Sequence, residues 1–155
     1  MTAHKAGEIY NALLSALQTG LRTKLFAATE DRNRWSVMCE SETPEQCPVW
    51  PYVSLEWPLR STPEALQSRR YRTTILFQIN AAVKIDPKRN AREAIFELAY
   101  HIEDVIADNF CLGGAVAQLI IQEMLMAPDR DAGLARCQFT VRANAHYLYD
   151  TPGTA

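Results

Sequence analysis

The sequence has no long uninterrupted apolar run. Near the N-terminus, His4, Lys5 and Glu8 interrupt the apolar residues, so the segment has no apolar core of the kind that a signal peptide needs. A membrane-spanning helix needs about 20 apolar residues in succession, and no segment provides them. We therefore expect neither a signal peptide nor an association with a membrane.

Strong net charge and closely spaced cysteines are missing too. The formal net charge of -2 gives the chain no overall attraction to nucleic acid, so any such contact would be local. Cys39, Cys47, Cys111 and Cys137 are too widely spaced for a structural zinc site, and we expect reduced thiols. With 155 residues, the chain is large enough to fold as one domain without metal or disulfide.

The signatures of common catalytic sites are missing as well. There is no nucleophile elbow, no glycine-rich phosphate loop and no signature pair of acids. Cys111 precedes a Leu-Gly-Gly segment, but no histidine stands at a recognisable spacing from it. We predict a protein that is not an enzyme and that holds no cofactor or metal.

The most regular stretch of the chain begins at Tyr71. Residues 71–85 alternate mostly apolar side chains with polar ones, which predicts a long strand with one buried face. Asp86-Pro87 ends the strand, and Asn90, with Glu93 three residues later, indicates the start of a helix. Its apolar positions recur at intervals of three and four up to Gly113-Gly114: Ile95, Leu98, Ala99, Ile102, Val105 and Ile106.

Other segments are less regular. Residues 5–25 predict a helix that ends near Gly20, because glycine weakens a helix by about 1 kcal/mol relative to alanine. Residues 35–39 and 53–59 predict two strands separated by a proline-rich loop at 40–51. A hairpin joins the second of them to the long strand, and the residues between these two, 61–70, predict a projecting arm. Residues 116–126 are apolar on both faces, which indicates either a central strand or a strand covered by another copy; residues 137–147 predict the last strand.

This order of elements predicts an α+β fold. We expect a mostly antiparallel sheet of four to five strands, with two helices packed on one face and a projecting hairpin arm. Residues 1–155 form a single domain in this prediction, and residues 151–155 are a flexible tail.

Two sets of charged residues are candidates for contacts. On the predicted central helix, the spacing of Glu97, His101, Asp104 and Asp108 gives one polar stripe, which suits either a divalent ion or a surface between subunits. Near the start of the long strand lies a cluster of arginines, whose forked donors suit phosphate or carboxylate. Its members are Arg60, Arg69, Arg70 and Arg72.

As a whole, the pattern resembles the tail terminator (tail-completion) proteins of long-tailed bacteriophages. The resemblance covers most of the chain: the helix with Ile9, Leu13 and Leu17, the proline-rich segment 48–57, the basic segment 69–72, the helix at 91–109 and the closing His146-Tyr147-Leu148-Tyr149. It implies a structural protein of the virion tail, assembled in the host cytoplasm. Such a protein forms a ring, typically a hexamer, at the end of the tail tube. The ring stops tube polymerisation and provides the interface to the head-tail connector, while DNA passes through its channel without sequence-specific binding.

Two alternatives stay open. One is a small oligomeric metal-dependent enzyme that uses the Glu/His/Asp stripe, and the other is a different phage neck or tube protein. In the ring interpretation, the arginines of one copy meet the helix acids of the next, with Arg70 and Asp104 as the first pair to test.

Overall fold

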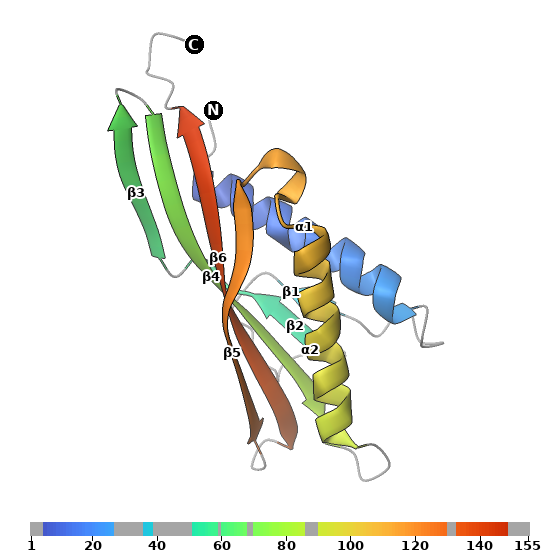
Figure 1. Ribbon diagram of the computed structural model, residues 1–155. Coiled ribbons are helices and arrows are strands. Elements are labelled where there is room, and N and C mark those ends of the chain that lie inside the picture. Colours follow the sequence, from blue (N-terminus) through green and yellow to red (C-terminus); the bar gives the residue numbers. More distant parts are fainter. Residues whose placement is uncertain are drawn as a thin grey trace.

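A computed structural model describes residues 5–26, 36–38, 51–58, 60–67, 70–85, 90–129 and 133–148. The chain runs in the order α1 (Lys5–Phe26), β1 (Ser36–Met38), β2 (Tyr52–Leu55), β3 (Arg60–Gln67), β4 (Arg70–Lys84), α2 (Ala91–Asp108), a 3-10 turn η2 (Leu112–Gly114), β5 (Gln118–Asp129) and β6 (Leu134–Leu148). Figure 1 shows these elements as one twisted sheet accompanied by two helices. Arg69 and the tail at 151–155 lie outside the described residues.

The sheet is built on the long antiparallel pair β4 and β6, which stay in register from Arg70↔Leu148 to Lys84↔Leu134. Outward from this pair the strand order is β1-β2-β4-β6-β5, and β3 also pairs with β4. Every pairing is antiparallel except that of β1 with β2. The predicted α+β class with a mostly antiparallel sheet is therefore confirmed, and the sheet is open.

The predicted arm is a hairpin. Residues 60–67, which we expected to project from the sheet, form β3 and pair with residues 70–76 of β4, and this adds a sixth strand. The described side chains of β3 are exposed, and Pro63 stands in the middle of this edge strand, where the missing N–H is tolerated. The hairpin and the adjoining part of β6 extend past the helices at the upper end of Figure 1. We call β3 and residues 70–76 of β4 the arm.

Both helices pack on the same face of the sheet. The alternating positions of β4 and β6 that point to this face are apolar and buried, among them Phe77, Phe139 and Val141, and they form one core with α1 and α2. At about 25 cal/mol per Å² of apolar area, burial on this face supplies the main stabilisation of the fold. The opposite face of β4 and β6 is polar, and we call it the open face.

The helix α1 does not end near Gly20 as the sequence predicts. It continues to Phe26, because Gly20 packs directly against α2: a Cβ atom at this position would stand 2.7 Å from Cγ2 of Val105. The glycine that weakens the isolated helix is the residue that lets the two helices approach each other. The packing of α1 outweighs the propensity cost of about 1 kcal/mol.

The shorter strands follow the prediction in part. β2 pairs antiparallel with the long strand β4, although β3 lies between them in the chain. β2 also pairs with β1, and these two strands run parallel, with Val37 opposite Val53. A parallel pair needs a crossover of a dozen or so residues, and the proline-rich segment at 40–51 is long enough to supply one. β5 is an edge strand rather than a central one, and Met124 and Leu125 are exposed. Of our two explanations for its apolar faces, the central strand is excluded.

The central helix follows its prediction closely. α2 buries Ile95, Leu98, Ala99, Ile102, Val105 and Ile106, the six positions that the periodicity indicated. Asn90 is the N-cap, and its side chain accepts a hydrogen bond from the backbone N–H of Glu93. The helix ends at Asp108 with Asn109 as its C-cap, close to the predicted end, and the glycines Gly113 and Gly114 take up positive φ in the η2 turn that follows.

Candidate functional site on the open face

The register of the sheet aligns polar side chains across the open face of the arm. One row runs from Glu64 on β3 through Arg72 on β4 to His146 on β6. Alternate residues of a strand share a face, so the next two rows follow from the same pairing. They are Thr62–Thr74–Asn144–Gln118 and Arg60–Leu76–Arg142–Ile120.

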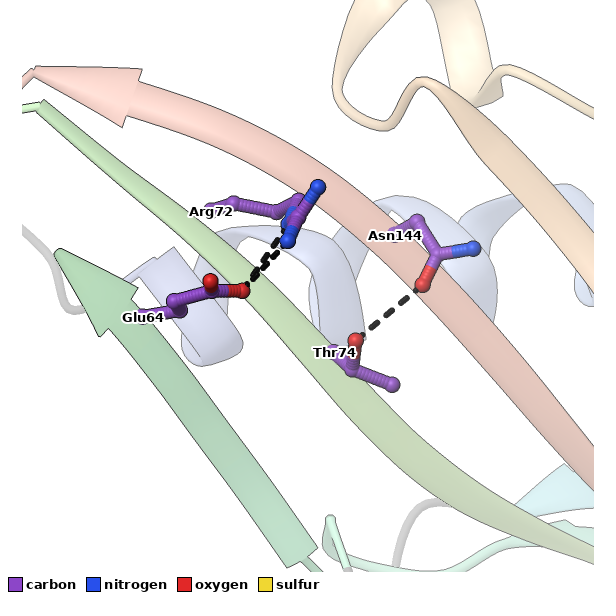
Figure 2. A network of polar contacts seen from close by, with 4 residues as sticks. All are labelled: Glu64, Arg72, Thr74 and Asn144. Atoms are coloured by element: carbon purple, nitrogen blue, oxygen red, sulfur yellow. Dashed lines mark hydrogen bonds and ion pairs between the residues drawn. The ribbon is translucent and has the colours of Figure 1, made fainter. Parts of the chain in front are cut away.

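Side-chain contacts join neighbouring strands in each of the first two rows, as Figure 2 shows. Arg72 donates from Nε to Oε2 of Glu64 at 3.2 Å, and its Nη2 contacts the same oxygen. Thr74 donates from Oγ1 to Oδ1 of Asn144 at 3.2 Å, so the amide N–H groups of Asn144 point elsewhere. Because the Arg72–Glu64 pair is about half exposed, it contributes at most about 1 kcal/mol, and its main effect is to fix two side chains.

A groove of about 630 Å³ lies over these rows. Its lining includes Arg72, Thr74, Arg142, Asn144 and His146. The exposed side chain of Phe110 lines it too. Nε of Arg142 is buried and finds no hydrogen-bond partner among the described residues. The groove is therefore rich in donors, with one carboxylate, that of Glu64, already bound to Arg72.

A polar network continues along the open face beyond the groove. Asn80 donates from Nδ2 to Oε1 of Glu56 at 2.7 Å, and Gln78 donates from Nε2 to Oδ1 of Asn80 at 3.2 Å. These bonds join Glu56, which follows β2, to two residues of β4.

The acidic stripe of α2 lies on the other side of the sheet. Glu97 and Asp108 are exposed, whereas His101 and Asp104 are half-buried at the margin of the core. Nε2 of His101 is 3.8 Å from Oε1 of Glu97, and its Nδ1 is buried without a hydrogen-bond partner among the described residues. No three possible metal ligands come together in the described part of the chain.

The outer side of α2 also carries exposed aromatic residues. Phe96 is 53% exposed and Tyr100 is 63% exposed, one helical turn apart, and the exposed acids Glu97 and Glu103 lie beside them. We call these four residues the outer face of α2. Exposed aromatic side chains flanked by charge are typical of protein contacts.

Neither of the two described cysteines has the features of a nucleophile, and Cys39 and Cys47 lie outside the described residues. Burial, and to a smaller extent the nearby charge of Glu103, raises the pKa of the Cys137 thiol from 9.0 to about 12. A thiol with so high a pKa carries almost no thiolate near neutral pH, which makes it unreactive. Cys111 is free and half-buried beside η2.

The structure brings together part of the predicted site and adds to it. Arg60, Arg70 and Arg72 all project on the open face, and the helix stripe lies on the opposite side, so one chain does not pair the two sets. Arg142 and His146 join the arginines only through the register of β4 with β6. Their alternate spacing in the last strand was visible in the sequence, but their strand partners were not.

Comparisons with known proteins give a likeness of fold. No protein-family model matches the chain, and a search of curated proteins finds no match. No helix in the described residues is long and apolar enough to cross a membrane. The fold is similar to that of a chain in the solved structure titled "Virion of native gene transfer agent (GTA) particle", with a TM-score of 0.51 and 16% sequence identity over 88% of this chain and 96% of that chain.

Proposed function

We propose that this protein is a structural component of a phage virion that forms a ring at the end of the tail tube. The ring stops tube polymerisation and provides the interface to the head-tail connector. Two findings support this: the resemblance of the sequence to tail terminators, and a fold similar to that of a virion chain along nearly the whole of both chains. Binding, rather than catalysis, is the activity.

The observation that carries the ring is the placement of two unlike surfaces on opposite sides of one domain. The outer face of α2 is aromatic and acidic, and the open face of the arm is rich in arginine. Two different surfaces that fit each other make a head-to-tail contact, which closes into a ring when the rotation between copies allows it. We expect a hexamer, and DNA passing through its channel without sequence-specific contacts.

The experiment is a capping assay on purified tail tubes. Tube subunits polymerise in the presence of increasing amounts of the protein, and tube lengths are measured in negative-stain images. We expect shorter tubes that carry a ring-shaped density at one end. Tubes of unchanged length with bare ends, at a protein excess over tube ends, would rule out the terminator function.

A second candidate is a metal-dependent enzyme, favoured only by the buried, unpartnered Nδ1 of His101 beside Glu97. A metal site usually takes ligands from more than one element, and this pair lies on one helix. Elemental analysis after mild purification separates the two functions. Stoichiometric zinc or manganese that is lost in His101→Ala would favour the enzyme.

A further inference from the structure

We propose that the groove at the arm end of the open face is a carboxylate-binding site that receives the outer face of α2 from a second copy of this chain. This inference rests on the proposed ring and names its contact. It places the guanidinium of Arg142 at the centre, where a carboxylate of the neighbouring helix would accept from it.

The groove supplies donors that have no acceptor of their own. Nε of Arg142 is buried without a partner among the described residues, and burying such a donor is unfavourable unless an acceptor reaches it. The amide N–H groups of Asn144 are directed away from Thr74, because Oδ1 accepts the bond from the threonine. A carboxylate can accept hydrogen bonds from both kinds of donor, and on this face Arg72 already donates to the carboxylate of Glu64.

The outer face of α2 supplies the matching chemistry. Glu97 and Glu103 present carboxylates beside Phe96 and Tyr100, so a contact with this surface would bring acidic and apolar side chains to the groove at once. Phe110, 57% exposed, gives the groove an aromatic side against which such rings pack. A nucleic acid fits less well, because a phosphate backbone brings no apolar side chain to pack against Phe110, and the charge of Arg72 is already neutralised by Glu64.

The two surfaces cannot meet within one chain. The core cluster places α2 on the helix-covered side of β4 and β6, and the register places Arg142 and Asn144 on the open side. Each copy therefore presents one outer face of α2 and one groove, and each of these surfaces can contact a different neighbouring copy. This arrangement makes a contact that repeats from copy to copy, and it is the kind of contact that a ring requires.

The test uses two variants of the full chain, each with one damaged surface. Arg142→Glu damages the groove, and the double variant Phe96→Ser with Glu97→Lys damages the helix face. Each variant alone should associate roughly 30-fold more weakly than the unchanged chain, as expected when one member of a buried charged pair is lost. A 1:1 mixture keeps one intact contact, so light scattering should find a dimer with one copy of each variant and no ring.

Matched controls carry the same charge changes elsewhere. Lys84→Glu changes an exposed residue at the far end of β4, and Glu8→Lys changes an exposed residue of α1. Both should assemble as the unchanged chain does. Far-UV circular dichroism and thermal unfolding check that each variant is folded, and Arg142→Gln, which removes the charge without reversing it, replaces Arg142→Glu if that variant does not fold.

The outcomes separate this inference from the proposed function. If the unchanged chain forms rings and Arg142→Glu forms them equally well, the groove contact is wrong and the ring stands. If Arg142→Glu forms rings that no longer cap tail tubes, the groove holds a carboxylate of a different virion protein, and the second copy is excluded. If the unchanged chain forms no ring at all, both ideas fail. A mixture that stays monomeric also overturns the contact.

Discussion

Gly20 provides the sharpest test of how the helices pack. In a solvent-exposed helix, replacing glycine by alanine stabilises by about 1 kcal/mol. Here the added Cβ would stand 2.7 Å from Cγ2 and 2.9 Å from Cγ1 of Val105, closer than such atoms approach. Valine is held near one rotamer in a helix, so its methyl groups cannot swing aside, and overpacking of this kind costs about 1–3 kcal/mol. We expect Gly20→Ala to destabilise the protein by about 1 kcal/mol net.

The same helix offers the matched control. Gly7 also lies in α1, and a Cβ there would meet nothing within 4 Å. Gly7→Ala should therefore be neutral or stabilising, by up to about 1 kcal/mol. The free energy of unfolding of both variants is measured by urea denaturation at one protein concentration, because assembly would make it depend on concentration. The double variant Gly20→Ala with Val105→Ala should recover about 1–2 kcal/mol relative to the sum of the single changes.

Two results would contradict the close packing of Gly20 against Val105. If Gly20→Ala stabilises the chain as much as Gly7→Ala does, then α1 and α2 do not approach each other at this point. The absence of any coupling between Gly20→Ala and Val105→Ala would contradict it in the same way.

Three further predictions follow from single contacts. Asn90→Ala removes the N-cap of α2 and should lower the free energy of unfolding by about 1 kcal/mol in urea denaturation, whereas Asn90→Asp, which keeps an acceptor, should not. Burial raises the pKa of Cys137 from 9.0 to about 12, so the stability that comes from its neutral thiol is fully present below pH 9 and is lost as pH rises toward 12. Between these values the free energy of unfolding should fall by about 1.4 kcal/mol per pH unit. Cys137→Ala should flatten that slope, whereas Cys111→Ala should leave it unchanged. Arg72→Gln breaks an exposed ion pair with Glu64 and should change the unfolding free energy by less than about 1 kcal/mol, which calorimetry checks.

Periodicity predicted the elements whose stability comes from burial on one face. The strand β4 and the helix α2 each carry one clear period along their length, and both formed as expected. The end of α1 was wrong because a local rule for glycine cannot include Val105, which lies far away in sequence. The parallel pairing of β1 with β2 was missed for a related reason, since alternation shows that a strand forms but not which way its partner runs.

The candidate site was predictable only in part. The arginines near β4 stand together in sequence, so their charge was evident before the fold was known. Arg142 and His146 lie some 70 residues away, and only the register of β6 with β4 places them on the same face. The acids of α2 were evident from the helical period, but the exposure of Phe96 and Tyr100 was not predictable, because aromatic residues in a helix usually face the core.

The central claim is that unlike surfaces of this chain meet head to tail in a closed ring. The most direct measurement is the solution mass of the unchanged chain by multi-angle light scattering over a range of concentrations, with negative-stain images of the largest species. The ring predicts one discrete species with a mass that is a multiple of the 17.5 kDa chain, six-fold for a hexamer, and a central hole in the images. A monomer at every concentration, or a dimer in which the same surface of both copies meets, would contradict it.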